Sequence, residues 1–212
     1  MKLVACAAAS LIVACSARGA RPAPPSQSVA HEVTWAAPQV DTLIRLGRED
    51  QEGRGALAQA MVRQDTAVML ASMRADSAHT RWLRTAVARY GWPIRSSVGD
   101  SAATSAWLIL QHSPDTAWQA AMLPELEQLG RRGELRLPDV ALLTDRVLVH
   151  RGEPQRYGSQ FNIVDGRLVP APIADLPGLN ARRASVELPP MTEYVRMLSE
   201  QMKLPVSWPP TQ

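Results

Sequence analysis

Apolar residues recur along the middle of the chain at the three- and four-residue steps that are typical of amphipathic helices. The first such stretch covers residues 40–73, and the glycines Gly53 and Gly55 within it are compatible with one kinked helix or with two helices. Asp76 is a candidate N-cap for the next helix, and Gly91 suits the position just past its end. Residues 40–90 are therefore predicted to be mainly helical.

Three more helices are predicted from the same signals. Asp100 is a candidate N-cap for the first, which carries Gln111 and His112 in its last turn. Asp115 opens the second helix, and the pair at 138–139 (Pro-Asp) opens the third.

The pattern changes near residue 157. Residues 157–164 and 167–171 flank the dipeptide Asp165-Gly166, which is a strong signal for a two-residue β-hairpin turn. Residues 190–203 then fit a last helix. The predicted fold class is therefore mainly α: a helical bundle with one β-hairpin appended near residues 157–171.

The start of the chain has the design of a secretory signal, in which a basic residue is followed by a short apolar core. Lys2 precedes an uncharged, mostly apolar run that is too short to span a bilayer. The sequence of residues 12–15, Ile-Val-Ala-Cys, resembles a bacterial lipobox, which predicts a signal peptide over residues 1–14 and lipidation of Cys15. The alternatives are a cut before Cys6, which leaves too little apolar core, and an ordinary signal peptide with an incidental Cys15.

Residues 15–38 are rich in proline and poor in large apolar side chains, so they are predicted to form a flexible tether that is dispensable for folding. Residues 39–208 then form a single domain. Both cysteines lie before this domain, which excludes a disulfide, a thiol nucleophile or a Cys-based zinc site within it. The expected location is outside the cytoplasm, on a membrane lipid anchor that faces the periplasm or the cell exterior.

Composition narrows the range of partners. The formal net charge is +3, and basic and acidic residues are interspersed along the chain rather than gathered in a basic stripe, so nucleic acid is not an expected partner. The four histidines lack metal-ligand spacing, and no metal or cofactor is expected. The expected partners are the membrane, through the anchor, and an envelope protein or small ligand.

Polar residues stand out where they interrupt apolar segments. His112 is a candidate general base, and Asp145 is the candidate residue to orient it. A second group of polar side chains is suited to ligand binding through amide, hydroxyl and guanidinium groups: Gln111, Arg146, Gln155, Tyr157 and Gln160. Because burying such groups separately is costly, six of these residues are predicted to converge in space: His112, Asp145, Arg146, Gln155, Tyr157 and Gln160.

Each of these residues also has a structural interpretation. His112 would be stabilised as a cation by its place at a helix end, and Asp145 and Arg146 could each take part in a buried pair. The two glutamines could hold the hairpin against the bundle, and Tyr157 could be a core residue of a strand. Asp50 and Arg54 are spaced for an ion pair along one helix face.

The motifs resemble those of a bacterial family classed as domain of unknown function 6624. The resemblance covers roughly residues 41–194 and rests on five short elements: Asp50-Gln51-x-x-Arg54, Gly91-Trp92-Pro93, Gln111-His112, Asp145-Arg146 and Gln155-x-Tyr157-Gly158-Ser159-Gln160. The last is the most specific, and Ser159 replaces the family's usual threonine. The resemblance supports the fold and the choice of residues, and it implies no mechanism.

Two functions follow as hypotheses. The first is a non-enzymatic envelope lipoprotein that acts as a binding or interaction module. The alternative is a hydrolase-like enzyme that acts on an envelope glycan or peptide, with His112 as general base. The absence of a nucleophile motif and of a clear pair of carboxylates favours the first.

Overall fold

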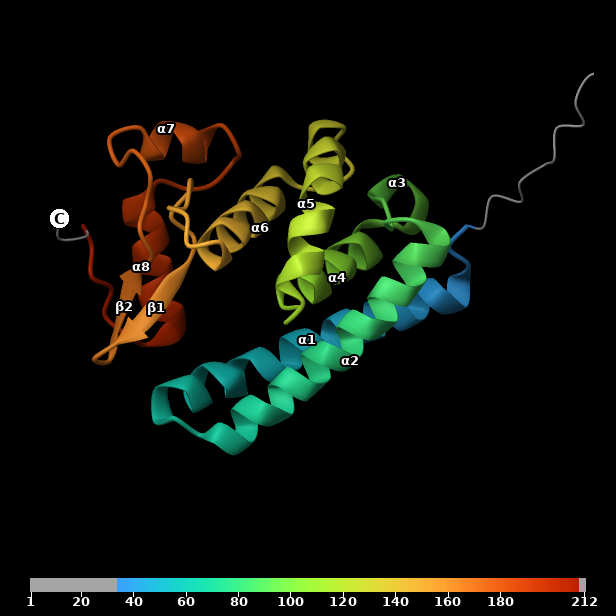
Figure 1. The fold of residues 1–212 in the computed structure, drawn as a ribbon, viewed down its shortest axis with the longest axis horizontal. Coiled ribbons are helices and arrows are strands. Elements are labelled where there is room, and N and C mark those ends of the chain that lie inside the picture. Colours follow the sequence, from blue (N-terminus) through green and yellow to red (C-terminus); the bar gives the residue numbers. More distant parts are fainter. Residues whose placement is uncertain (1–33, 210–212) are drawn as a thin grey trace, which may run out of the picture. The chain divides into compact units, whose positions relative to one another are not determined.

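The computed structural model describes residues 34–209. The predicted signal peptide, Cys15 and most of the predicted tether lie outside the described residues. Within residues 34–209 the chain forms eight helices and one two-stranded antiparallel hairpin (Figure 1). The predicted fold class, mainly α with one appended hairpin, is confirmed.

The first two helices lie side by side (Figure 1): α1 spans Ala37–Arg63 and α2 spans Thr66–Tyr90. The chain reverses at Gln64, which adopts a left-handed conformation, and Asp65 caps α2 by accepting hydrogen bonds from two backbone N–H groups. Residues 40–73 therefore fall in two helices, which is one of the two predicted alternatives. The break lies at Gln64 and Asp65, and α1 runs continuously through Gly53 and Gly55. Packing against α2 keeps this part of α1 helical although glycine has a low helix propensity.

Four helices follow: α3 (Arg95–Val98), α4 (Asp100–Gln111), α5 (Thr116–Arg131) and α6 (Leu137–His150). Asp115 caps α5 through a hydrogen bond of 2.9 Å from the backbone N–H of Trp118, as its position predicted. Helix α4 carries much of the core, because small and large apolar side chains on most of its circumference are buried. The neighbouring helices α1, α2, α5 and α6 contribute Leu43, Leu83, Leu126 and Leu143, all fully buried.

The hairpin consists of β1 (Phe161–Val164) and β2 (Arg167–Pro170), joined by the predicted Asp165-Gly166 turn. The first strand is shorter than predicted. Residues 157–160 lie outside it because several of their backbone N–H groups donate to buried side chains instead of to a strand.

Two helices complete the fold: α7 (Leu179–Ala184) and α8 (Met191–Met202). The segment after α8 returns to the hairpin, where Leu168 donates a backbone hydrogen bond to Pro205 and accepts one from Ser207. This return holds α8 and the hairpin together.

Trp35 precedes α1 and packs on the helical bundle. Its indole N–H donates a hydrogen bond of 3.1 Å to the carbonyl of Gly91, and its ring lies against Trp82 and Tyr90. The sequence placed Trp35 in the tether, whereas its contacts make it part of the domain.

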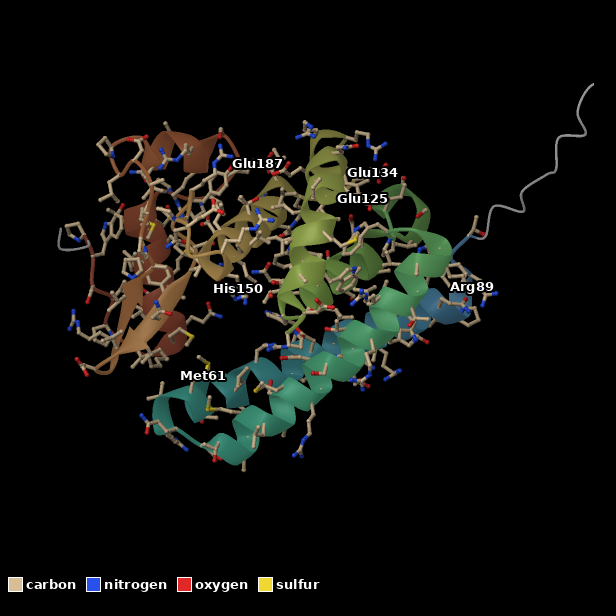
Figure 2. The ribbon with its side chains drawn as sticks, in the orientation of Figure 1. Met61, Arg89, Glu125, Glu134, His150 and Glu187 are labelled. Carbon is tan, nitrogen blue, oxygen red and sulfur yellow. The ribbon has the colours of Figure 1, made fainter. Side chains whose placement is uncertain are left out.

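Around the turn between α1 and α2, large apolar side chains are exposed to solvent. Met61, labelled in Figure 2, is exposed there, as is Met73 on α2. Within residues 34–209 no helix combines the length and apolar composition that a membrane-spanning segment needs.

Candidate functional site

An open cleft of about 300 Å³ lies where α4, α6, α8 and the hairpin meet. Six apolar side chains form part of its lining: Trp107, Leu142, Phe161, Leu168, Leu198 and Met202. Six polar side chains form the rest: Gln111, His112, Arg146, Ser159, Gln160 and Tyr194. The cleft therefore offers an apolar wall and several hydrogen-bonding groups within one small volume.

Helical spacing of four residues places these side chains together. Leu142 and Arg146 lie one turn apart on α6 and share a face. The same step on α8 aligns Tyr194, Leu198 and Met202 along the cleft. Each helix therefore presents one stripe to the cleft, and α4 and α6 keep most of their other sides in the core.

His112 lies at the end of α4 and pairs with Asp50 of α1. Its Nδ1 lies 2.8 Å from one carboxylate oxygen of Asp50 and 3.1 Å from the other. Burial alone would raise the pKa of Asp50, but hydrogen bonds and charges from His112 and Arg54 outweigh it and lower the pKa to about 2. Because an ionised carboxylate only accepts hydrogen bonds, the proton lies on Nδ1. In a neutral ring, Nε2 is then the basic nitrogen.

Arg54 connects this pair to α2. Its guanidinium donates to Asp50 on its own helix and to Asp76 on α2. Burial alone would lower the pKa of Arg54, but the two carboxylates outweigh it and raise the pKa. Asp76, predicted as an N-cap, instead lies in the middle of α2, where it joins the two helices. The carboxylates of Asp50 and Asp76 thus compensate the charge of Arg54.

Arg146 lies in a different electrostatic setting. It lines the cleft, and within residues 34–209 its guanidinium makes no ion pair with a carboxylate. Its Nε is buried without a hydrogen-bond partner. Burial, together with the nearby charge of Arg54, lowers the pKa of Arg146. His150 follows one turn later at the end of α6 (Figure 2), and burial and the charge of Arg146 lower its pKa as well.

Asp145, next to Arg146, serves the hairpin rather than His112. Its carboxylate is fully buried and accepts hydrogen bonds from the backbone N–H groups of Arg156, Tyr157 and Ser159, at 2.7, 3.0 and 2.9 Å. Adjacent residues on a helix point in different directions, so Asp145 and Arg146 cannot both face the cleft. The partner of His112 is therefore Asp50, and the prediction that Asp145 orients His112 is corrected by this geometry.

Gln155 also stabilises the segment that leads into the hairpin, through hydrogen bonds of its buried side chain. Its amide nitrogen donates to the carbonyls of Gln160 and Ala171, at 3.0 and 2.8 Å, and its amide oxygen accepts from the backbone N–H of Gln160 at 2.8 Å. Tyr157 lies nearby, where its carbonyl accepts a hydrogen bond from the buried Arg183. Gln155 and Tyr157 are not among the residues that line the cleft.

The structure therefore divides the predicted residues into two sets. Gln111, His112, Arg146 and Gln160 share the cleft, whereas Asp145, Gln155 and Tyr157 form the loop support behind it. The amide oxygen of Gln111 is buried without a hydrogen-bond partner.

Sequence reasoning missed Asp50 as the partner of His112, and it missed Tyr194 and Ser159 in the cleft lining. The Asp50-Arg54 spacing was visible, but its link to a residue far along the chain was not. The four-residue spacing of Tyr194, Leu198 and Met202 was a signal that could have indicated a shared face.

Comparison with protein families matches residues 38–207 to a family described as a family of unknown function, DUF6624. Neither the curated proteins nor the solved structures contain a match to the chain. Among residues 34–209, no group of three or more His, Cys, Asp or Glu side chains is placed to hold a metal ion.

Proposed function

Since the chain belongs to the family of unknown function DUF6624, its role must be argued from its own residues, and we propose that it is an exported lipoprotein whose domain binds a small ligand in the cleft. The observation that supports binding is that two of the nine buried side-chain polar atoms without partners in residues 34–209 belong to the cleft: the Nε of Arg146 and the amide oxygen of Gln111. Both residues line the cleft.

Unpaired buried polar atoms cost free energy, on the order of 1–3 kcal/mol each. Folded proteins leave few of them, and those that remain call for a physical explanation. A ligand that accepts a hydrogen bond from Arg146 would offset part of this cost when bound. The mixture of an apolar wall and a few polar groups is typical of small-molecule sites.

The proposal that the protein is exported rests on the first residues of the chain. Lys2, the short apolar run and the lipobox-like residues 12–15 together support processing at Cys15. A single acyl chain binds a membrane only marginally, so stable anchoring requires more than one chain.

We predict that Cys15→Ala abolishes labelling by a fatty acid and moves the protein out of the membrane fraction or blocks its processing. The matched control is Cys6→Ala, which lies within the predicted signal peptide and is expected to leave labelling intact. Radiolabelled palmitate and membrane fractionation provide the measurement. Identical labelling and fractionation of wild type and Cys15→Ala would disprove the lipoprotein proposal.

Ligand binding is tested by closing the cleft. Leu198 lines it, whereas its neighbour Met197 is exposed and does not. Native mass spectrometry of the full chain, extracted from its own envelope in mild detergent, should show a small-molecule adduct for wild type and for Met197→Trp. Leu198→Trp should lose the adduct. An adduct that survives Leu198→Trp, or no adduct on wild type, contradicts the proposal.

A second candidate function is catalysis with His112 as general base. It is supported by the hydrogen bond between Nδ1 of His112 and buried Asp50, which fixes the ring and leaves Nε2 as the basic nitrogen of the neutral form. Asp50 would then be a positioning residue. Under this alternative, the full chain hydrolyses envelope peptide or glycan fragments, and His112→Gln loses turnover but retains the adduct. Absence of turnover by wild type rules this alternative out.

A further inference from the structure

The side chains that line the cleft include a cation and no carboxylate. Its lining contains one arginine, Arg146, and one histidine, His112, and contains no aspartate or glutamate. The other polar lining groups are hydroxyls and amides, which can donate hydrogen bonds: Ser159, Gln111, Gln160 and Tyr194. A cleft with this composition favours a negatively charged guest.

Two carboxylates near Arg146, those of its neighbour Asp145 and of Asp50, already have hydrogen-bond partners of their own. Asp145 accepts three backbone N–H groups, and Asp50 is shared by His112 and Arg54. Arg146 is therefore left as an uncompensated cation in a partly buried position. Removing a cation from water without a partner is costly, and a bound anion reverses that cost.

Half of the lining side chains are apolar. Phe161 on β1 and Leu198 and Met202 on α8 line the cleft and are each partly buried, so they remain able to contact a guest. Apolar contact with these three side chains would add affinity for a hydrocarbon or aromatic body.

We propose that the cleft binds a small molecule in which one oxyanion, a carboxylate or a phosphate, is joined to an apolar body. Arg146 is the counter-ion of the oxyanion, and Phe161, Leu198 and Met202 contact the apolar body. This inference rests on the proposed ligand-binding function and specifies the chemical class of the ligand.

The test compares three probes of similar size that differ in the head group: 3-phenylpropionate, 2-phenylethyl phosphate and the neutral 3-phenylpropanamide. Each is titrated into the full chain in detergent, and binding is followed through the NMR signals of the probe. We expect at least one anion to bind wild type at least about tenfold more tightly than the amide, as charge-assisted hydrogen bonds imply. The order of the two anions identifies the oxyanion.

Arg146→Met keeps an unbranched apolar stem and removes the charge and the hydrogen-bond donors. We expect it to weaken binding of the anions by at least about tenfold and so to abolish their preference over the amide. Arg151→Met is the matched control, because Arg151 is exposed at the end of the same helix and does not line the cleft. It should retain the preference of wild type.

Equal binding of the amide and both anions to wild type overturns the inference, as does a preference that survives Arg146→Met. Because the wild-type comparison needs no variant, a poorly folded Arg146→Met leaves the proposal falsifiable. The proposed function fails separately, through the envelope adduct and Leu198→Trp. An adduct lost in Leu198→Trp together with equal binding of the probes would retain the binding module and reject the oxyanion.

Discussion

Asp50 connects the fold and the candidate site at the scale of single residues. It contacts Gln51 and Arg54 on its own helix and His112 on α4, and 1% of its side chain is exposed. A buried carboxylate is tolerated only when it is paired and hydrogen-bonded, and here Arg54 and His112 meet that condition. The orientation of His112 in the cleft therefore depends on Asp50.

We predict that Asp50→Asn lowers the free energy of unfolding at pH 7 by about 2 kcal/mol, as the shift of its pKa from 3.8 to about 2 implies. Because the folded-state pKa is lowered, ionised Asp50 stabilises the fold above about pH 4, and this stabilisation is lost as the pH falls towards 2. Urea denaturation between pH 7 and pH 2 measures both effects.

Glu52→Gln is the matched control for Asp50→Asn. Glu52 lies on the same helix in an exposed ion pair at 3.8 Å, so its loss should change stability by less than about 0.5 kcal/mol. If Asp50→Asn behaved like this control over the whole pH range, the ion pair would not contribute as described.

A second residue-scale prediction concerns Asp145. Asp145→Asn leaves buried backbone N–H groups facing an amide, and it should lower the free energy of unfolding by about 3 kcal/mol. Asp165→Asn is the control, because asparagine also accepts the left-handed conformation that Asp165 adopts in the hairpin turn. Chemical denaturation measures the free energy of unfolding of the two variants. Equal stability of Asp145→Asn and Asp165→Asn would refute the structural role of Asp145.

At the scale of elements, α1 and α4 approach closely at one glycine. A Cβ built on Gly47 would lie 2.3 Å from the hydroxyl of Ser105 and 2.9 Å from its Cα. Gly53, on the same helix, has no neighbour within 4 Å in that direction. The two glycines therefore have different roles: Gly47 permits helix packing, whereas Gly53 contributes only flexibility.

We predict that Gly47→Ala and Gly53→Ala change stability in opposite directions. Gly47→Ala forces α1 and α4 apart and should cost about 1–3 kcal/mol, as overpacking does. Gly53→Ala should stabilise the protein by about 0.5–1 kcal/mol through better helix propensity. Thermal unfolding of the two variants measures the contrast, and a stabilising Gly47→Ala would contradict the close packing.

At the scale of the whole described domain, the cleft depends on elements that lie far apart in the sequence. Helix α4 supplies Gln111 and His112, while the hairpin and α8 supply Gln160 and Tyr194. Asp145 and Gln155 hold the hairpin loop in place behind the cleft. Stability of the loop and geometry of the site are consequently coupled.

The start of the domain provides the last prediction. A chain that begins at Pro38 lacks Trp35 and its contacts with Trp82 and Tyr90, and it should unfold several degrees below one that begins at Thr34. Trp35→Ala in the longer chain should reproduce the loss. Equal melting temperatures of the two truncated chains would place Trp35 outside the stable fold.

Local sequence patterns were sufficient for most elements of the fold. The cap at Asp115, the Gly91 helix end and the Asp165-Gly166 turn each act through neighbouring residues, so each was readable from the sequence. The family resemblance was likewise readable from short motifs, and the match over residues 38–207 confirms it.

Tertiary structure alone decided which polar residues meet. His112 pairs with Asp50, 62 positions away, and not with Asp145, because the packing of α1 on α4 brings the first two together while the loop at 156–159 occupies the carboxylate of Asp145. Hydrogen-bond partners of this kind leave no periodic trace in a sequence, since their spacing depends on how the elements between them pack. The sequence alone determined the elements and many of the polar residues of the cleft, and packing determined their partners.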